Sequence, residues 1–187
     1  AVLRLWSKAV TTPKKDSKPV KEFYNKYGEK PPWFLVISPG HACNLKCDDC
    51  YAASNPTGAK LDYSVLDRLI GDARRLWDIK LVVFSGGEPF AYKSEGKGIL
   101  DIAQRYQDCL FLTYTNGTLI DKAAAARIAE CKNLTPAISV EGMRKTTDKR
   151  RGNGIFDRVL SSMELLRKQG VPFGISVTAN SFNQKEI

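Results

Sequence analysis

The sequence lacks any long apolar segment. No run of apolar residues approaches the roughly 20 that a helix needs to cross a bilayer, and no signal peptide is recognisable. Cysteine is scarce and odd in number, with five residues in a chain of 187, which argues against the paired framework of a small secreted protein. We therefore expect a cytoplasmic protein, long enough for one domain with a substantial core.

A fourth cysteine is missing from the most distinctive motif. The run CNLKCDDC places three thiols at Cys43, Cys47 and Cys50. Structural zinc closes its tetrahedron with four cysteine or histidine ligands, and an iron–sulfur cluster normally takes four thiolates. Three thiolates leave one iron of a [4Fe–4S] cluster open to another ligand. From the triplet alone, a zinc knuckle and a ferredoxin-like electron carrier stay open as alternatives.

The other residues that could bind a metal are expected to do something else. Cys109 precedes a buried strand and Cys131 lies near the end of a helix, so both are expected to be small core residues. His41 is the only histidine, and we expect it on the surface or beside the cysteine loop. The predicted metal ligands are therefore the three cysteines of the motif alone.

The formal net charge of +9 is concentrated at the N-terminus. Residues 1–33 hold eight basic side chains, which are Arg4, Lys8, Lys14, Lys15, Lys18, Lys21, Lys26 and Lys30. Five aromatic residues are interleaved with them, namely Trp6, Phe23, Tyr24, Tyr27 and Trp33. Such an arm suits an anionic membrane surface, a nucleic acid or an acidic peptide, whereas the simpler alternative is a solvated lead-in to the core domain. Pro31 and Pro32 mark the predicted boundary between this arm, 1–33, and a core domain, 34–187.

From residue 34 onward, strand-like and helix-like segments alternate. This alternation predicts an α/β fold with a parallel sheet and helical crossovers. The expected strands are 34–38, 81–84, 110–114, 137–140 and 173–177. Two apolar stripes at helical spacing are expected to face the core; they consist of Val65, Leu66, Leu69, Ile70, Leu76 and Trp77, and of Val159, Leu160, Met163 and Leu166.

Every polar motif follows one of these strands. The cysteines follow the first, Gly86 to Glu88 the second, Asn116 the third, Ser139 to Glu141 the fourth and Asn180 the fifth. Parallel α/β sheets and barrels place their sites at the carboxyl ends of the strands. The motifs are therefore expected to meet in one site.

Taken together, the motifs resemble those of the radical S-adenosylmethionine (radical SAM) enzymes, whose signature is C-x3-C-x2-C followed by a GGEP-type motif. The resemblance covers residues 34–187 and implies a partial parallel (β/α) barrel, of which five of the usual six βα units are visible. The core domain is thus expected to be incomplete at its C-terminus. The resemblance also implies two cofactors, a [4Fe–4S] cluster and S-adenosylmethionine, whose reductive cleavage yields a 5′-deoxyadenosyl radical that abstracts hydrogen from an unreactive C–H bond.

Roles for individual residues follow from the same resemblance. Gly86 and Gly87 are expected to let the backbone approach closely, and Glu88, together with the exposed carbonyls of this strand end, to receive the methionine ammonium group. Asn116 lies in the sequence TNG, residues 115–117, which resembles a motif of the family. It is therefore expected at the cofactor. Two residues of the fourth strand end, Ser139 and Glu141, are expected at the ribose or methionine end. Arg151 offers a guanidinium fork for the methionine carboxylate, with Arg150 as the fallback.

One position departs from the family pattern. The residue before the third cysteine is usually aromatic and contacts the adenine, but here it is Asp49. The expected adenine contacts are therefore the Asp49 backbone and the ring of Tyr51, which follows the cysteine.

The motifs look most like those of maturases and cofactor-biosynthesis enzymes. We expect a radical SAM oxidoreductase or maturase with a peptide or protein substrate. The alternatives are a lipid or cofactor precursor, with the N-terminal arm at a membrane surface, and a non-catalytic iron–sulfur electron carrier. RNA modification is a weaker alternative. Flavodoxin or ferredoxin is the expected one-electron donor.

Overall fold

The computed structural model describes residues 17–187 except residue 54. Its centre is a sheet of five strands, all of whose neighbouring pairs are parallel. The strands lie side by side in chain order and are β1 (Phe34–Ile37), β2 (Leu81–Phe84), β3 (Leu110–Thr115), β4 (Leu134–Ser139) and β5 (Gly174–Ser176). The predicted parallel α/β fold is confirmed.

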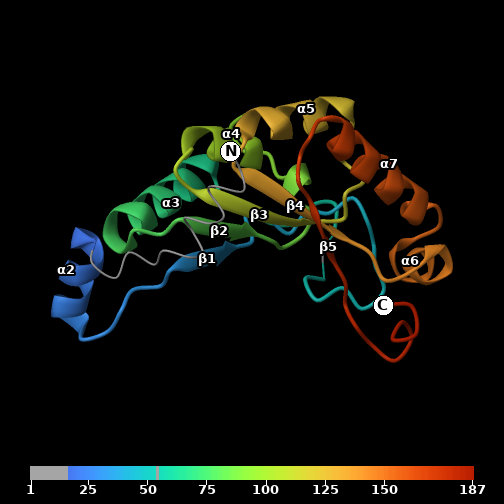
Figure 1. Ribbon diagram of the computed structural model, residues 1–187, viewed down its shortest axis with the longest axis horizontal. Coiled ribbons are helices and arrows are strands. Elements are labelled where there is room, and N and C mark those ends of the chain that lie inside the picture. The colour runs from blue at the N-terminus through green and yellow to red at the C-terminus, as the bar shows by residue number, and fades with distance from the viewer. Residues whose placement is uncertain (1–16, 54) are drawn as a thin grey trace.

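The helices are α2 (Lys18–Tyr27), α3 (Tyr63–Trp77), α4 (Ile99–Arg105), α5 (Lys122–Cys131), α6 (Arg144–Arg151) and α7 (Ile155–Lys168), with a short 3-10 turn at Pro89–Ala91. Helix α2 precedes β1, and the others connect consecutive strands. Four of the connecting helices cover one face of the curved sheet (Figure 1). Helices α3, α4, α5 and α7 lie above the sheet in Figure 1. The opposite, concave face and the strands' carboxyl ends are left for a site.

The main core lies between the sheet and these helices. Phe84 of β2 and Phe111 of β3 are fully buried there and stack with ring centroids 5.5 Å apart. Leu66 and Ile70 of α3 pack onto the same cluster. Each such side chain stabilises the fold by roughly 1.5–3 kcal/mol through burial, so the strands that carry the site rest on a rigid base.

Two sequence predictions need correction in detail. Strand β4 begins at Leu134 rather than at residue 137. Pro136 lies inside this central strand, opposite Thr113 of β3, although proline lacks the amide proton of a sheet ladder. Because proline is rare in central strands, a prediction based on strand propensity missed the first half of β4.

The apolar stripes on α3 and α7 are only partly buried. Leu66 and Ile70 are buried, but Val65, Leu69 and Leu76 are between 38% and 46% exposed, as is Leu160 of α7. The predicted stripe on α3 is wider than the surface that this helix presents to the sheet. The helical spacing of apolar residues predicted the helices, but it did not show which of these residues are buried in the core.

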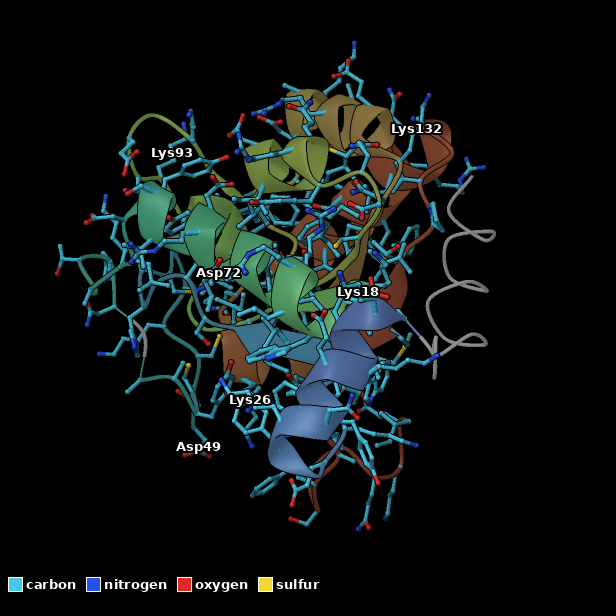
Figure 2. The ribbon with its side chains drawn as sticks, turned by 90° about the vertical axis from the view of Figure 1, so that its left-hand side faces the viewer. Lys18, Lys26, Asp49, Asp72, Lys93 and Lys132 are labelled. Carbon is cyan, nitrogen blue, oxygen red and sulfur yellow. The ribbon has the colours of Figure 1, made fainter. Side chains whose placement is uncertain are left out.

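The two ends of the described chain lie outside the sheet. Figure 2 shows α2 beside the end of α3, with Lys18 and Lys26 at its two ends, and no residue of α2 is buried. The remaining predicted arm residues, 1–16, fall outside the described part. Residues 181–186 form turns. Among the described helices, none is long and apolar enough to cross a membrane.

Candidate functional site

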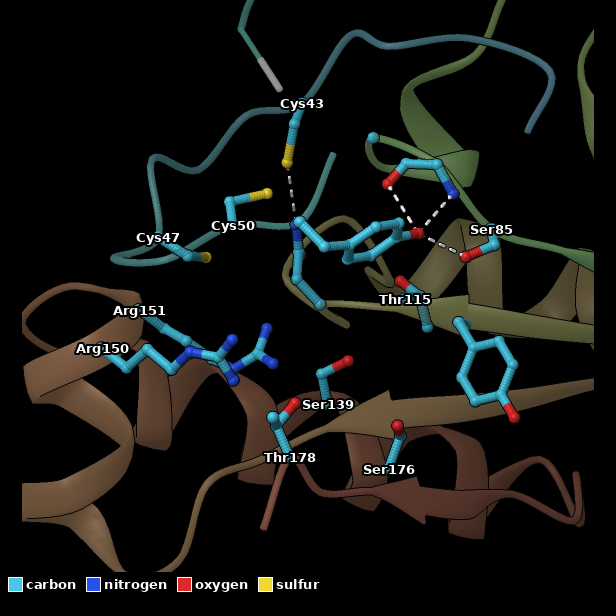
Figure 3. A pocket seen from close by; sticks show the side chains of 15 residues that line it. Cys43, Cys47, Cys50, Ser85, Thr115, Ser139, Arg150, Arg151, Ser176 and Thr178 are labelled. Atoms are coloured by element: carbon cyan, nitrogen blue, oxygen red, sulfur yellow. Dashed lines mark hydrogen bonds between the residues drawn. The ribbon is translucent and has the colours of Figure 1, made fainter. Parts of the chain in front are cut away.

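A pocket of about 290 Å³ opens at the carboxyl ends of the strands. The loop after β1 contributes Cys43, Cys47 and Cys50 to one side of it, and the ends of β4 and β5 contribute hydroxyl groups to the other (Figure 3). Every one of the five strands leads into a residue of its lining. The expected convergence of the motifs in one place is thus observed.

The loop that carries the three cysteines is irregular and is held by a few backbone hydrogen bonds. The amide of Cys43 donates to the carbonyl of Asn55 at 3.1 Å, and the amide of Ala53 donates to that of Cys50 at 3.0 Å. The Cys43 sulfur also faces two donors, the backbone amide of Leu45 at 3.5 Å and the side-chain amide of Asn116 at 3.8 Å. Such N–H groups stabilise a sulfur that carries negative charge.

Partial burial raises the pKa of the Cys43 and Cys47 thiols above the ordinary value. The nearby guanidinium groups of Arg151 and Arg150 oppose this rise at Cys47, since they favour the thiolate. Without a bound metal the thiols are therefore protonated near neutral pH, and metal binding must release their protons.

The other two cysteines lie in the core, away from the pocket, as predicted. Cys109 and Cys131 are fully buried, and their thiols donate to the carbonyl oxygens of Ile79 and Leu100. Burial raises the pKa of each to about 11. Neither thiol is placed to complete the set in the pocket.

The three pocket cysteines fit an iron–sulfur cluster better than a single metal ion. Within the described residues, no three cysteine, histidine or acidic side chains are gathered closely enough around one point to hold an ion. In a [4Fe–4S] cluster each thiolate binds a different iron, so its sulfurs are spread around the cube. Three half-buried thiols around one pocket match that donor set.

Gly86 and Gly87 lie where the end of β2 touches the segment before Cys43. The amide of Gly87 donates to Gly40 and that of Glu88 to Ala42. A Cβ atom on Gly87 would lie 2.2 Å from the Ala42 carbonyl oxygen, and Gly86 has a φ of +103°. Both glycines line the pocket, so the expected close approach is present, and its observed partner is the cysteine loop.

Glu88 does not line the pocket. It is only 2% exposed, and its carboxylate accepts hydrogen bonds from Thr115 Oγ1 at 2.7 Å, from the Asn116 amide at 2.8 Å and from the Phe90 amide at 3.0 Å. Burial raises its pKa, while these donors and Arg151 act in the opposite direction. Both oxygens thus accept hydrogen bonds that join β2 to β3, and the expected contact of Glu88 with a methionine ammonium group stays a prediction.

Glu141 is also buried outside the lining and anchors two arginines. Its Oε1 atom accepts from Arg151 Nε at 2.9 Å and Nη2 at 2.5 Å, and lies 2.9 Å from Arg150 Nη1. Glu141 is 1% exposed, and its expected contact with the cofactor stays a prediction. Both arginines line the pocket, and Arg151 is therefore oriented for an anionic group by a buried carboxylate.

The two residues expected at the adenine lie differently. Tyr51 lines the pocket, and its hydroxyl lies 2.7 Å from Ser85 Oγ and accepts from the Gly86 amide at 3.1 Å. Asp49 is exposed, outside the lining, with a φ of +52°, and its carbonyl accepts from Arg150 at 3.4 Å. The expected contact of the Asp49 backbone with the base is therefore not supported by its position.

Two further predicted residues, Asn116 and Ser139, line the pocket. Asn116 follows β3 and joins the Glu88 carboxylate to Asn44 of the cysteine loop, through its backbone amide and its side chain respectively. Sequence reasoning missed five lining residues, which are Ser85, Tyr114, Thr115, Ser176 and Thr178. All five lie at or just after the carboxyl end of a strand, which is the signal that could have identified them.

The family model of the radical SAM superfamily matches residues 37–187, most of the chain and all of the site described above. The chain belongs to the radical SAM superfamily. Members of this superfamily bind a [4Fe–4S] cluster and S-adenosylmethionine, and the three thiols with the open pocket beside them fit that pair of groups.

Known relatives share the fold and span more than this chain. Fe-coproporphyrin III synthase of Methanosarcina barkeri is 29% identical over 175 residues, which cover 92% of this chain and 43% of the relative. The solved structure of native anSMEcpe with bound AdoMet and Cp18Cys peptide is 28% identical, with a TM-score of 0.62 over 78% of this chain and 42% of that one. Streptococcus suis SuiB bound to its precursor peptide SuiA is 21% identical, with a TM-score of 0.71 over 88% of this chain and 38% of that one. This radical SAM chain therefore spans less than half the length of each of these relatives.

Proposed function

We propose that this radical SAM domain catalyses hydrogen abstraction from an unreactive C–H bond of its substrate. The observation that carries the proposal is the set of three thiols, Cys43, Cys47 and Cys50, on one side of a pocket whose other side is polar. A [4Fe–4S] cluster held by three thiolates keeps one iron open for S-adenosylmethionine, whose reductive cleavage supplies a 5′-deoxyadenosyl radical.

The residues around the thiols position and charge-balance the cofactor. Arg151, held by the buried Glu141, offers a guanidinium group to the methionine carboxylate. Ser139 at the end of β4 offers a hydroxyl to the ribose or methionine. Backbone carbonyls of Gly86 and Gly87, which line the pocket, accept from the methionine ammonium group, and the buried Glu88 beside them adds negative charge. Preorganised groups of this kind fix the geometry in which a reactive species forms.

An electron carrier is a less suitable function for this site. A carrier needs a cluster whose irons are all bound by the protein. The other two cysteines, Cys109 and Cys131, are buried in the core and do not line the pocket. A carrier also has no need of Arg151 and Glu141. The cluster proposed here instead receives one electron from a flavodoxin or ferredoxin.

We propose a tetrapyrrole with carboxylate side chains as the substrate class. The match to Fe-coproporphyrin III synthase covers 92% of the chain, which leaves only about 15 residues outside it. That match therefore includes α2, which begins at Lys18, in addition to the core domain. This match covers more of the chain than the match to anSMEcpe, which covers 78% of it, and this difference favours a tetrapyrrole as the substrate class.

A peptide is the second candidate substrate. The anSMEcpe structure, which is 28% identical to this chain, contains AdoMet together with a peptide. The likeness of the sequence motifs to those of maturases also favours a peptide or protein substrate. The alternative of a lipid precursor, with contact of the N-terminal arm to a membrane surface, stays a prediction.

The test is an anaerobic assay for 5′-deoxyadenosine. The chain is reconstituted with iron and sulfide, reduced with dithionite and given S-adenosylmethionine, alone and with an iron porphyrin that carries carboxylate side chains or a cysteine-containing peptide. We expect 5′-deoxyadenosine from the wild type and none from Cys47→Ala, while Cys109→Ala behaves as the wild type. Binding of the porphyrin, seen as a shift of its Soret band, supports the tetrapyrrole, and faster 5′-deoxyadenosine formation with the peptide alone favours the second candidate. A reconstituted cluster that yields no 5′-deoxyadenosine in any mixture contradicts the proposal.

A further inference from the structure

We propose that Arg150 is a positioning residue that fixes the segment between Cys47 and Cys50 against helix α6. The inference rests on the proposed function in one respect, namely that these cysteines hold the cluster. The contacts themselves are independent of any cofactor. They join residues that are about a hundred positions apart in the sequence.

Arg150 makes three hydrogen bonds with two consecutive residues of the cysteine loop. Its carbonyl accepts from the Asp48 amide at 2.9 Å. Its guanidinium donates from Nε to the Asp48 carbonyl at 3.2 Å and from Nη2 to the Asp49 carbonyl at 3.4 Å. Asp48 directly follows Cys47, and Asp49 directly precedes Cys50. The backbone of both ligand positions is therefore tied to one arginine.

The same arrangement recurs at the other two cysteines, with different partners. Asn44 follows Cys43, and its side chain donates to Thr118 Oγ1 at 2.8 Å and accepts from Asn116 at 3.0 Å, beyond the end of β3. Tyr51 follows Cys50 and reaches the end of β2. In each case the residue after a cysteine makes the attachment to the sheet or its helices. The middle attachment depends on Arg150, since Asp48 contributes only its backbone.

A buried carboxylate keeps Arg150 in place. Arg150 Nη1 lies 2.9 Å from Glu141 Oε1, and the arginine side chain is only 23% exposed. Glu141 binds Arg151 through the same oxygen, so one carboxylate orients both the loop attachment and the group expected to meet the cofactor carboxylate. Figure 3 shows the two guanidinium groups side by side below Cys47. The position of Cys47 is thereby coupled to the position of Arg151.

Lysine cannot replace arginine at this position. The guanidinium presents Nε and Nη2 in a fixed planar fork toward the two carbonyls and leaves Nη1 for Glu141. The three N–H donors of an ammonium group sit on one nitrogen atom, which cannot reach the two carbonyls and the Glu141 carboxylate as three separate guanidinium nitrogens do. Arg150→Lys is therefore a variant that keeps the charge near Glu141 and removes the two side-chain hydrogen bonds to the loop, while the backbone bond from the Asp48 amide stays possible.

The first experiment is amide hydrogen exchange on the cluster-free protein. We compare Arg150→Ala and Arg150→Lys with the wild type and with Lys145→Ala, which removes an exposed charge from the same helix. We expect exchange of the Asp48 amide to be roughly tenfold faster in both Arg150 variants, because without the two guanidinium bonds the loop opens more often and breaks the bond from this amide to the carbonyl of residue 150. The core amides of β3 and the Lys145→Ala protein should remain as in the wild type. If Arg150→Ala fails to fold, the exchange rates of Arg150→Lys alone test the proposal.

The second experiment measures the cluster rather than activity. After reconstitution, we expect both Arg150 variants to lose iron to a chelator about tenfold faster than the wild type, and the electron paramagnetic resonance signal of the reduced cluster to broaden, because Cys47 is held less firmly. A purely structural role of Arg150 would lower the melting temperature without changing that signal. Wild-type exchange and iron loss in both variants, or equal changes in Lys145→Ala, would overturn the inference. Because the exchange measurement needs no cluster, it tests the attachment even if the proposed function fails.

Discussion

The carboxylate of Glu88 lies 2.7 Å from the hydroxyl of Thr115. This short contact joins the ends of β2 and β3 below the pocket, and Glu88 is buried while Thr115 lines the pocket wall. The acidic residue of the GGEP motif therefore supports the site from beneath. Its neighbours Gly86 and Gly87 are the residues of the motif that reach the pocket.

Replacing Glu88 with glutamine should destabilise the protein. The glutamine amide would place an N–H group opposite the Asn116 amide, which now donates to Oε2, and two donors would face each other in a buried site. We expect a loss of about 1–3 kcal/mol in the free energy of unfolding. Urea denaturation of the cluster-free protein measures it, with Glu130→Gln on the exposed face of α5 as the control. An unchanged midpoint in Glu88→Gln would show that the buried network contributes little.

Substituting Gly87 with alanine should be more damaging than substituting Gly174. A Cβ atom at Gly87 would lie 2.2 Å from the Ala42 carbonyl oxygen, whereas one at Gly174 would meet nothing within 4 Å. Overpacking against backbone typically costs about 1–3 kcal/mol, and here it would also displace the segment before Cys43. We expect Gly87→Ala to lower both the unfolding free energy and the iron content after reconstitution. Equal stability of the two variants would contradict the observed contact between β2 and the cysteine loop.

The five cysteines should react with iodoacetamide in two groups. The thiols of Cys43, Cys47 and Cys50 are partly exposed, while Cys109 and Cys131 are buried. Burial raises the pKa of both core thiols to about 11, and only the thiolate reacts. At pH 8 the folded, cluster-free protein should therefore gain three labels and the denatured protein five. As the pH rises toward 11, the core thiolate fraction increases, so their labelling should accelerate.

Mass spectrometry of the labelled peptides counts the modified cysteines. Bound cluster should protect the first group, which serves as an internal control. Rapid labelling of Cys109 in the folded protein at pH 8 would contradict its placement in the core.

Tyr51 should contribute to cofactor binding mainly through its ring. The side chain is 79% exposed although its hydroxyl contacts Ser85 and Gly86, so the ring is free to pack against a bound adenine. We expect Tyr51→Ala to weaken S-adenosylmethionine binding by about tenfold, in line with the roughly 0.5–1.5 kcal/mol of an aromatic contact. Tyr51→Phe should retain most of the affinity. Calorimetry on the anaerobic, reconstituted protein measures both, and equal losses in the two variants would assign the contribution to the hydroxyl instead.

The location of the site could be predicted from the sequence, because motifs at strand ends must meet at one edge of a parallel sheet. The orientation of individual side chains could not. Glu88 and Glu141 were expected to face the cofactor, but each meets buried donors from another element, Thr115 in one case and Arg151 in the other. Such contacts depend on which face of the strand end a side chain leaves.

A second limit on predicting the site from the sequence is that some of its residues are of common types. Ser176 and Thr178 line the pocket but belong to no motif that stands out from ordinary loop composition. The predicted helical stripes failed at Leu69 and Leu160 because a periodic pattern identifies an apolar face and not how much of it is covered. The candidate metal ligands were easier to choose, since three closely spaced cysteines have few other uses in a chain without a disulfide framework; their ligand role stays a prediction.

Electron paramagnetic resonance of the reduced, reconstituted protein, recorded with and without S-adenosylmethionine, tests the central claim most directly. That claim is that Cys43, Cys47 and Cys50 hold a [4Fe–4S] cluster with one iron open to the cofactor. We predict a reduced-cluster signal whose g values shift when S-adenosylmethionine is added, and no such signal in Cys47→Ala. A signal that S-adenosylmethionine leaves unchanged, or a cluster that forms equally well in Cys47→Ala, would contradict the account.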